Sequence, residues 1–282
     1  AKGWAIQLSD PAREAALVGA WLLAKGSRAP PFHFPGVKQG SGMDFSLGRH
    51  QAFRDSLRQF IADQPKTACP RDVETSAASE GFSREFHGAL GRGGYVSLGL
   101  PEAYGGRPAN PVEQTIFNEE LSLETGHHNS PLATTRLVSQ TLAVFGTEEQ
   151  KASYLRRAAA GEIIFALGYT EPGSGSDVAA ANTRAIRQGD EWVITGQKMF
   201  TTSGDFADYV FLLARTDTDK SKHRGLTMFL VPLSAKGIGV SQIETMGGVK
   251  TTTTYYDDVK VADAQRVGPV DGGWDVLTHA LK

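Results

Sequence analysis

The segment FALGYTEPGSGSD, residues 165–177, places an apolar run directly before a loop of small and acidic residues. Thr170 stands where the run ends and can offer a hydroxyl at the end of a strand. The loop then supplies main-chain N–H groups that no large side chain covers, at Gly173, Ser174, Gly175 and Ser176. Glycines let a backbone approach a ligand closely, and consecutive N–H groups form a concave donor site for anions. A phosphate or pyrophosphate would fit this loop.

The same loop also has an explanation without a ligand. Gly, Pro and Ser are preferred in turns for their backbone dihedral angles, so the segment could simply join two strands. The sequence has no strand followed by GxGxxG and a helix, and no loop ending in GK[ST]. A Rossmann dinucleotide site and a P-loop are therefore not indicated. On this segment alone, the turn and the anion site both stay open.

A second segment, GQKMFTTSGDFADYVFLLART at residues 196–216, adds a different set of side chains. Phe200 supplies an aromatic ring, and Thr201, Thr202 and Ser203 supply hydroxyls directly after it. A flat cofactor ring needs an apolar wall and a few hydroxyls at its polar edge. The second segment therefore raises the weight of the ligand-binding interpretation of the loop.

Helical signals dominate from Met43 to Gly161, and these residues are expected to form an all-helical N-terminal domain. Asn110 can cap a helix, with Glu113 at the capping-box position. A second helix is expected over residues 130–146, and TEEQ at residues 147–150 is the capping box of the next one. Short links between such helices favour antiparallel neighbours in a bundle.

Strand signals begin after Gly161, where the apolar period changes from helical to about two. Residues 183–202 are expected to form a hairpin that turns at Gln188, Gly189 and Asp190. Further strands are expected in DYVFLLART, GLTMFLVPL and TTTTYYDDVKVA. These antiparallel strands predict a β-barrel over residues 162–272, which makes the fold class α+β. Residues 273–282 are expected to begin a C-terminal helical domain, whereas residues 1–42 are expected to be an appendage or linker.

The composition excludes several classes of protein. The chain has 282 residues, 40% of them hydrophobic and 21% charged, which is ordinary for a globular protein. A formal net charge of −2 argues against a dedicated nucleic-acid binder. The longest apolar run, residues 15–24, is too short to cross a membrane. Cys69 is the only cysteine, so no intramolecular disulfide can form, and a cytoplasmic location is expected.

Taken together, these segments resemble the acyl-CoA dehydrogenase family. Three segments follow the order of that family's middle-domain motifs: TEPGSGSD at residues 170–177, GQKMFTT at residues 196–202 and ARTD at residues 214–217. Other segments are similar to the family's helical domain and barrel exit: LPEAYGG, NEELS, FGTEEQKASYL, and DDVKVADAQRVG, which leads into GGW. The resemblance covers the chain from about Met43 to Lys282.

The resemblance implies that FAD is the cofactor and assigns it to named residues. Thr170 would hydrogen-bond the pyrimidine side of the flavin, and Gly175 with Ser176 would contact the pyrophosphate. Leu167 and Tyr169 would line the same strand. Phe200 would pack on the flavin ring where family members commonly have Trp, and Thr202 would reach the N5 region. The change from Trp to Phe keeps an aromatic wall but removes an N–H donor.

The resemblance also implies α,β-dehydrogenation of an acyl-CoA thioester, with electrons passed to an electron-transfer acceptor and assembly as a homo- or hetero-oligomer. Ser176 and Leu137 would contact the substrate, Leu137 in the acyl cavity. No catalytic residue is identified in the chain, because the family's base is a C-terminal Glu expected beyond Lys282.

Three alternatives stay open at this point. The chain could be a non-catalytic partner subunit that completes another chain's site, or a fragment without independent activity. It could also be a flavin-dependent monooxygenase or nitroalkane-type oxidase, which would use oxygen in place of an electron-transfer acceptor.

Several other polar residues have simpler structural explanations. Glu119 and Glu120 are neighbours on a helix, so they do not face each other and are expected to be solvated or salt-bridged. The basic residues 220–225 fit a solvated hairpin tip better than a CoA phosphate site. His127 and His128 lack further spaced ligands, so no metal site is predicted. Cys69 has no apparent His partner and is given no catalytic role.

Overall fold

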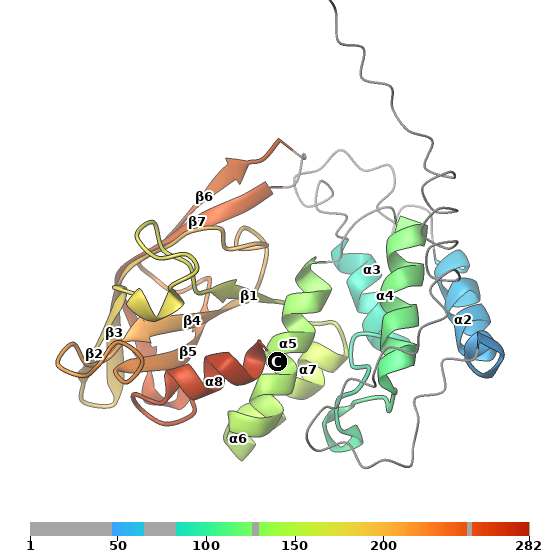
Figure 1. The fold of residues 1–282 in the computed structure, drawn as a ribbon, viewed down its shortest axis with the longest axis horizontal. Helices are drawn as coiled ribbons and strands as arrows, with labels where there is room; N and C mark the ends of the chain where they lie inside the picture. Colours follow the sequence, from blue (N-terminus) through green and yellow to red (C-terminus); the bar gives the residue numbers. More distant parts are fainter. Residues whose placement is uncertain (1–46, 65–82, 126–129, 247–249, 282) are drawn as a thin grey trace, which may run out of the picture. The chain divides into compact units, whose positions relative to one another are not determined.

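The computed structural model describes residues 47–64, 83–125, 130–246 and 250–281 (Figure 1). The expectations about residues 1–42, Cys69, His127 and His128 lie outside these ranges. In the helical half the chain forms the following elements: α2 (Leu47–Ala62), α3 (Arg84–Arg92), a 3-10 turn at Glu102–Tyr104, α4 (Pro111–Thr125), α5 (Ser130–Phe145), α6 (Glu148–Gln150), a π-helical turn at Lys151–Leu155, and α7 (Arg156–Ala159).

The expected helix starts are confirmed at atomic detail. The side chain of Asn110 accepts a hydrogen bond from the Glu113 main chain, and the Glu113 carboxylate accepts one from the Asn110 N–H, both at 3.0 Å. Thr147 and Gln150 form the same reciprocal capping box at the start of α6. Each box satisfies main-chain donors that a helix start leaves without partners.

The helical half has its own hydrophobic core, in which aromatic rings meet. The ring of Tyr95 stacks on that of Phe117 with centroids 5.8 Å apart. Above this core, Glu120 is buried and paired with Arg54 and Arg58 of α2, whereas Glu119 is exposed. The two acids are therefore salt-bridged, and the expectation for them is confirmed. The core consists of Leu57, Ile61, Phe86, Leu90, Tyr95, Val96, Leu98, Phe117, Leu121 and Leu132.

The second half of the chain is a mixed sheet. Its strands are β1 (Phe165–Gly168), β2 (Arg184–Gln188), β3 (Glu191–Lys198), β4 (Tyr209–Arg215), β5 (Leu226–Pro232), β6 (Ile238–Glu244), β7 (Lys250–Ala262) and β8 (Arg266–Val267). The strand order is β6-β7-β3-β2-β4-β5-β8, and β1 pairs with β4. The predicted hairpin is β2–β3, in which Gln188 pairs with Glu191.

The sheet is mostly antiparallel, as expected, but it contains parallel pairings that the sequence pattern did not predict. Strand β1 runs parallel to β4, with Phe165 opposite Tyr209, and β2 meets β4 in parallel at Arg184 and Arg215. Parallel neighbours need a long connection. The connection between β1 and β4 provides it, because the whole β2–β3 hairpin lies within it.

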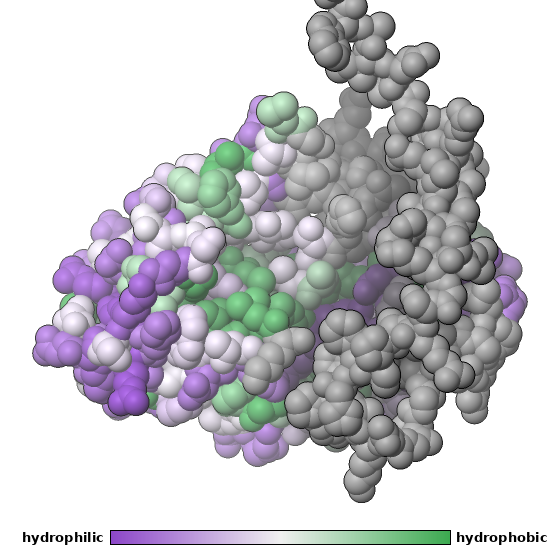
Figure 2. Space-filling model, viewed as in Figure 1, coloured by the Kyte–Doolittle hydropathy of each residue, from purple (hydrophilic) through white to green (hydrophobic). Residues whose placement is uncertain are grey.

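Strand β4 shows how both faces of the sheet are buried. Its alternate residues Phe211 and Leu213 belong to one core cluster, and Val210 and Leu212 belong to another. Helices α5 and α8 (Gly273–Ala280) contribute side chains to the first cluster, whereas β3 and β7 contribute to the second. One face of β4 therefore packs with the helices α5 and α8, and its other face packs with β3 and β7 of the same sheet. Figure 2 shows hydrophobic residues gathered in the middle of this half and hydrophilic ones at its outer left edge.

The two halves are joined by direct contacts. The hydroxyl of Thr135 in α5 accepts a hydrogen bond from the Phe165 N–H of β1 at 3.2 Å. Gln150 of α6 donates to the carbonyls of Ala264 and Arg266 before and within β8, both at 2.8 Å. Helix α8 begins at Gly273, where it was expected. No helix in the described ranges combines the length and the apolar character needed to cross a membrane.

Candidate cofactor-binding site

The loop after β1 is a closed turn with an open outer side. Glu171 and Ser174 exchange main-chain hydrogen bonds of 2.9 and 3.0 Å, which fixes the turn. At Gly173 and Gly175 a Cβ atom would have no neighbour within 4 Å. Packing against the described residues therefore does not require these glycines, and this side of the loop is open. The buried hydroxyl of Ser174 has no hydrogen-bond partner among the described residues.

A buried ion pair holds the start of this loop. The Nζ of Lys198, at the end of β3, lies 2.8 Å from the Oε1 of Glu171. The Lys198 side chain is fully buried, and it also donates to the carbonyl of Tyr169 at 3.2 Å. The Glu171 carboxylate accepts further hydrogen bonds from the N–H groups of Asn182 and Thr183. Three main-chain groups, the Tyr169 carbonyl and the N–H groups of Asn182 and Thr183, are thus tied to one ion pair.

The two groups of the pair influence each other's protonation. Burial lowers the pKa of Lys198 to about 8, although the nearby Glu171 carboxylate acts in the opposite direction. Burial alone would raise the pKa of Glu171, but the charge and hydrogen bonds of Lys198 and the main-chain donors hold it below its ordinary value. Both groups are therefore charged at neutral pH, and each provides the other's counter-charge.

The segment after β3 meets the end of β1. The Met199 N–H donates to the Thr170 carbonyl at 2.8 Å. Thr201 is buried and exchanges hydrogen bonds with Thr252 of β7, at 2.8 and 2.7 Å. Between these anchored positions, Phe200 has a φ of 59° and is 58% exposed. A positive φ costs free energy for a bulky residue. The hydrogen bonds of Met199 and Thr201 therefore hold the Phe200 backbone in a conformation that it does not prefer, with the ring in solvent.

Charged side chains frame the far end of the loop. Arg215 of β4 donates to the carbonyls of Ala179, Ala181 and Lys222. Lys222 in turn forms an ion pair with Asp177, the last residue of the predicted loop. The basic segment 220–225 is therefore tied to the site by these contacts, although it lies at a hairpin tip as expected.

The structure brings only some of the predicted residues together. Thr170 lies beside Phe200 through the Met199 hydrogen bond, whereas Gly175 and Ser176 are exposed on the adjoining loop. Thr202, half-buried, follows Phe200 by two residues.

The strand residues Leu167 and Tyr169 lie at the interior instead. Leu167 is half-buried and packs against the core, and the Tyr169 ring is buried against Phe211 with centroids 6.3 Å apart. Burial raises the pKa of the Tyr169 hydroxyl, which has no hydrogen-bond partner among the described groups.

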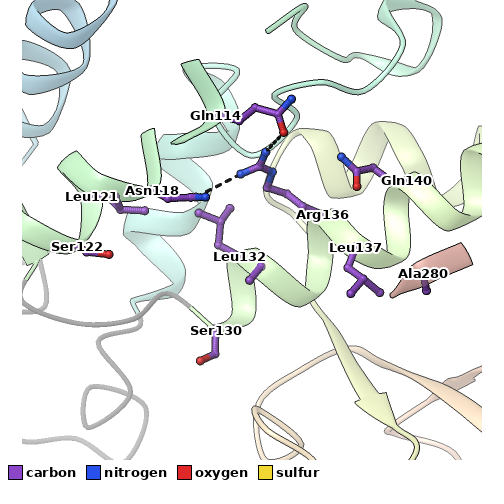
Figure 3. A pocket seen from close by; sticks show the side chains of 11 residues that line it. Gln114, Asn118, Leu121, Ser122, Ser130, Leu132, Arg136, Leu137, Gln140 and Ala280 are labelled. Atoms are coloured by element: carbon purple, nitrogen blue, oxygen red, sulfur yellow. Dashed lines mark hydrogen bonds between the residues drawn. The ribbon is translucent and has the colours of Figure 1, made fainter. Parts of the chain in front are cut away.

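Leu137 lies elsewhere, in a pocket between α4, α5 and the end of α8 (Figure 3). The pocket has a volume of about 490 Å³. Its lining is Gln114, Asn118, Leu121, Ser122, Ser130, Leu132, Ala133, Arg136, Leu137, Gln140 and Ala280. Leu137 was predicted from the sequence, whereas Arg136 beside it was not.

Sequence reasoning also missed Lys198 and Glu171. One signal for the lysine was present: it shares its alternation along β3 with Trp192 and Ile194, which both face the core. A lysine at a core-facing strand position calls for a buried carboxylate partner. Which carboxylate that would be is not apparent from spacing, because 27 residues separate Glu171 from Lys198.

The arrangement fits a planar ring with a linked phosphate: an exposed aromatic ring, nearby hydroxyls, and an open glycine loop. Comparison with known proteins identifies the family of the chain. The family model for the acyl-CoA dehydrogenase N-terminal domain matches residues 48–162, and the model for the middle domain of these enzymes matches residues 166–259. The chain therefore belongs to the acyl-CoA dehydrogenase family.

Individual relatives agree with this assignment. The chain is 41% identical over 240 residues to acyl-CoA dehydrogenase FadE26 of Mycobacterium tuberculosis, covering 83% of this chain and 59% of that protein. It is 33% identical to a short-chain-specific acyl-CoA dehydrogenase of Clostridium acetobutylicum, covering 85% and 63%. Among solved structures, the Tcur3481–Tcur3483 steroid ACAD has a TM-score of 0.76 at 38% identity, covering 83% of this chain and 60% of that one.

The comparisons confirm the family and the order of a helical domain followed by a sheet-rich domain. The chain spans roughly half to two-thirds of the length of these relatives, 59% for FadE26 and 63% for the clostridial enzyme. The assignments of single residues to cofactor or substrate are not tested by these matches and stay predictions.

Proposed function

We propose that this chain is part of an FAD-dependent acyl-CoA dehydrogenase, which converts an acyl-CoA thioester to the α,β-enoyl-CoA. The observation that carries the proposal is the exposed, backbone-strained ring of Phe200 beside Thr170 and the open loop 171–175. An aromatic ring held toward solvent at a conformational cost is expected to have a ligand to cover it. Membership of the family supports FAD as that ligand.

The predicted residues would hold the cofactor in the following way. The Phe200 ring would pack on the flavin, and the hydroxyls of Thr170 and Thr202 would hydrogen-bond its polar edge. The N–H groups of Gly175 and Ser176 would bind the pyrophosphate, while Tyr169 and Leu167 would support the strand from the core side. Bound FAD would accept a hydride from the substrate β carbon, and a base would take the α proton. We propose that this base is a glutamate outside residues 1–282.

Membership of the family does not specify the acyl group of the substrate. Relatives of this chain are named for short-chain acyl, (2S)-methylsuccinyl-CoA, glutaryl-CoA and steroid substrates. We propose that the acyl chain passes Ser176 and ends near Leu137, in the pocket between α4 and α5. Electrons would leave through an electron-transfer acceptor. The cytoplasmic location expected from the single cysteine remains a prediction.

A second candidate function is that of a partner chain that completes a site in another subunit. One similar solved structure is the ChsE4–ChsE5 complex from Mycobacterium tuberculosis, with a TM-score of 0.74 at 36% identity and 87% coverage of this chain. This neighbour supports a hetero-oligomer. In that case the chain would bind FAD weakly or not at all unless its partner is present.

Visible absorption of the purified chain after incubation with FAD tests the proposal. We expect bound flavin, and we expect it to bleach on anaerobic titration with a saturated acyl-CoA once the part of the protein that carries the proposed glutamate base is present. Phe200→Leu should weaken FAD binding about tenfold, because a stacked ring is lost. Val144→Ala is the control, since Val144 is an equally exposed apolar residue, at 57%, on α5.

The outcomes separate the candidate functions. Bound flavin that bleaches supports a dehydrogenase, and rapid oxygen consumption by the reduced protein would point to the oxidase or monooxygenase instead. Absence of bound flavin in the chain alone, with binding restored by a co-expressed partner, would favour the partner-chain function. FAD binding that Phe200→Leu leaves unchanged would contradict the assignment of this site.

A further inference from the structure

The pocket between α4 and α5 contains a cation that has no counter-ion among the described residues. Arg136 is half-buried there, and its guanidinium donates to the side-chain oxygens of Gln114 and Asn118 at 2.8 and 3.4 Å. A third bond, of 3.4 Å, goes to the carbonyl of Leu98. All of these acceptors are neutral. Within the described ranges no carboxylate pairs with Arg136, and its Nε has no hydrogen-bond partner.

A partly buried charge in this state is unfavourable for the protein alone. Removing a cation from water costs free energy that neutral acceptors repay only in part. In agreement with this, burial lowers the pKa of Arg136 below its ordinary value. The Phe117 ring lies 5.8 Å from the guanidinium carbon and adds a weak cation–π contact. An anion would complete the set, because guanidinium binds carboxylates through paired N–H donors.

The rest of the lining has matching chemistry. None of its described residues is acidic, and Asn118, Ser122, Ser130 and Gln140 add hydrogen-bond donors to those of Arg136. Figure 3 shows the guanidinium turned toward Gln114 and Asn118, with Leu137 and Ala280 at the other side of the pocket. One end can therefore bury an apolar stem while the other receives a charged group.

We propose that Arg136 recognises a carboxylate at the far end of the acyl chain, so that the ligand is the mono-CoA thioester of a dicarboxylic acid. The inference rests on the proposed function for the thioester part of the ligand. The carboxylate part rests on the pocket alone.

Binding measurements on the purified chain test this specificity. Linear dicarboxylic acid mono-CoA thioesters of increasing length are titrated beside plain acyl-CoA thioesters of the same lengths. We expect the carboxylated ligand to bind at least about tenfold more tightly at one preferred length, as for a hydrogen bond between charged groups. Arg136→Gln should remove this preference, so that the carboxylated ligand binds no more tightly than the plain acyl-CoA of the same length. Arg136→Lys should keep part of it, because the charge remains but the paired donors are lost.

The control variant is Arg92→Gln, which removes an exposed arginine on α3 and should keep the full preference. No preference for the carboxylated ligand at any length would overturn the inference. So would equal weakening of both ligands by Arg136→Gln, because that result indicates a structural role for the arginine.

A second measurement does not depend on thioester binding. Free dicarboxylic acids of the preferred lengths should raise the melting temperature of the wild-type chain but not that of Arg136→Gln. If no thioester binds and this shift is still seen, the proposed function fails while the carboxylate site stands. If neither the shift nor the thioester preference is seen, the carboxylate site is wrong.

Discussion

At the scale of single residues, the ion pair of Lys198 and Glu171 links stability to the site. Glu171 directly follows Thr170, and the hydrogen bonds of the pair reach the Tyr169 carbonyl before it and the N–H groups of Asn182 and Thr183. A buried pair of this kind adds little net stability over an apolar pair, but removal of one partner leaves an uncompensated charge. Its clearest function is therefore to hold the Thr170 main chain in one position.

We expect Glu171→Gln to lower the free energy of unfolding by about 3–5 kcal/mol, because Lys198 then lacks its counter-charge. The double variant Glu171→Gln/Lys198→Met should lose clearly less than the sum of the single losses. Urea denaturation without cofactor measures both. Glu148→Gln, which breaks the exposed pair with Lys151, is the control and should change little. Additive losses would show that the two side chains act independently.

At the scale of elements, local signals predicted the helix starts and the β2–β3 hairpin well. Caps and tight turns depend on residues within a few positions of each other, such as Asn110 with Glu113. Strand β6 was not predicted, because most of its residues are exposed at the sheet edge and show no apolar alternation. The parallel pairing of β1 with β4 was missed for another reason: nothing local specifies a partner more than 40 residues away.

The same difference between local and long-range signals explains which features of the candidate site were predicted. Thr170 and Phe200 stand in recognisable motifs, so each was predicted separately. Their proximity depends on the bond from Met199 to Thr170, which only the fold provides. The Arg136 pocket lies between two helices and leaves no motif in the sequence.

Gln150 links α6 to the segment around β8, so its substitution tests the contacts between elements. Its side chain completes the capping box of α6 and donates to the carbonyls of Ala264 and Arg266. Gln150→Ala should lower the free energy of unfolding by about 2–3 kcal/mol, because the hydrogen bonds of this buried side chain to two carbonyls and to the Thr147 N–H are lost. Glu149→Ala, at the exposed neighbouring position, is the matched control and should change little. Thermal unfolding by calorimetry compares them, and equal melting temperatures for the two variants would contradict a joining role.

At the scale of the whole molecule, acid stability should depend on His87 in α3. Burial lowers the pKa of His87 to about 4, and the charge of Arg84 adds to the effect while Asp208 opposes it. The imidazole titrates near pH 6.5 in an unfolded chain. Between pH 6.5 and 4, the unfolded state therefore binds a proton that the folded state does not, and stability falls as pH falls.

The expected loss from this residue is up to about 3 kcal/mol between pH 7 and 4. His87→Gln should flatten the pH dependence of the free energy of unfolding, measured by urea denaturation at several pH values. His223→Gln removes an exposed imidazole from the β4–β5 loop and should keep the wild-type slope. An unchanged slope in His87→Gln would show that other groups cause the acid sensitivity.

The strand order also has a consequence for how the protein is made. Strand β3 ends at Lys198, but its second neighbour, β7, begins only at Lys250. During synthesis from the N-terminus, the β3 edge with Trp192 and Ile194 therefore waits for more than 50 further residues to be translated. Unpaired apolar edges are sites of aggregation, and distant pairings form slowly. The helical half can fold early on the ribosome, whereas the sheet is completed late and is the part that a chaperone would need to protect.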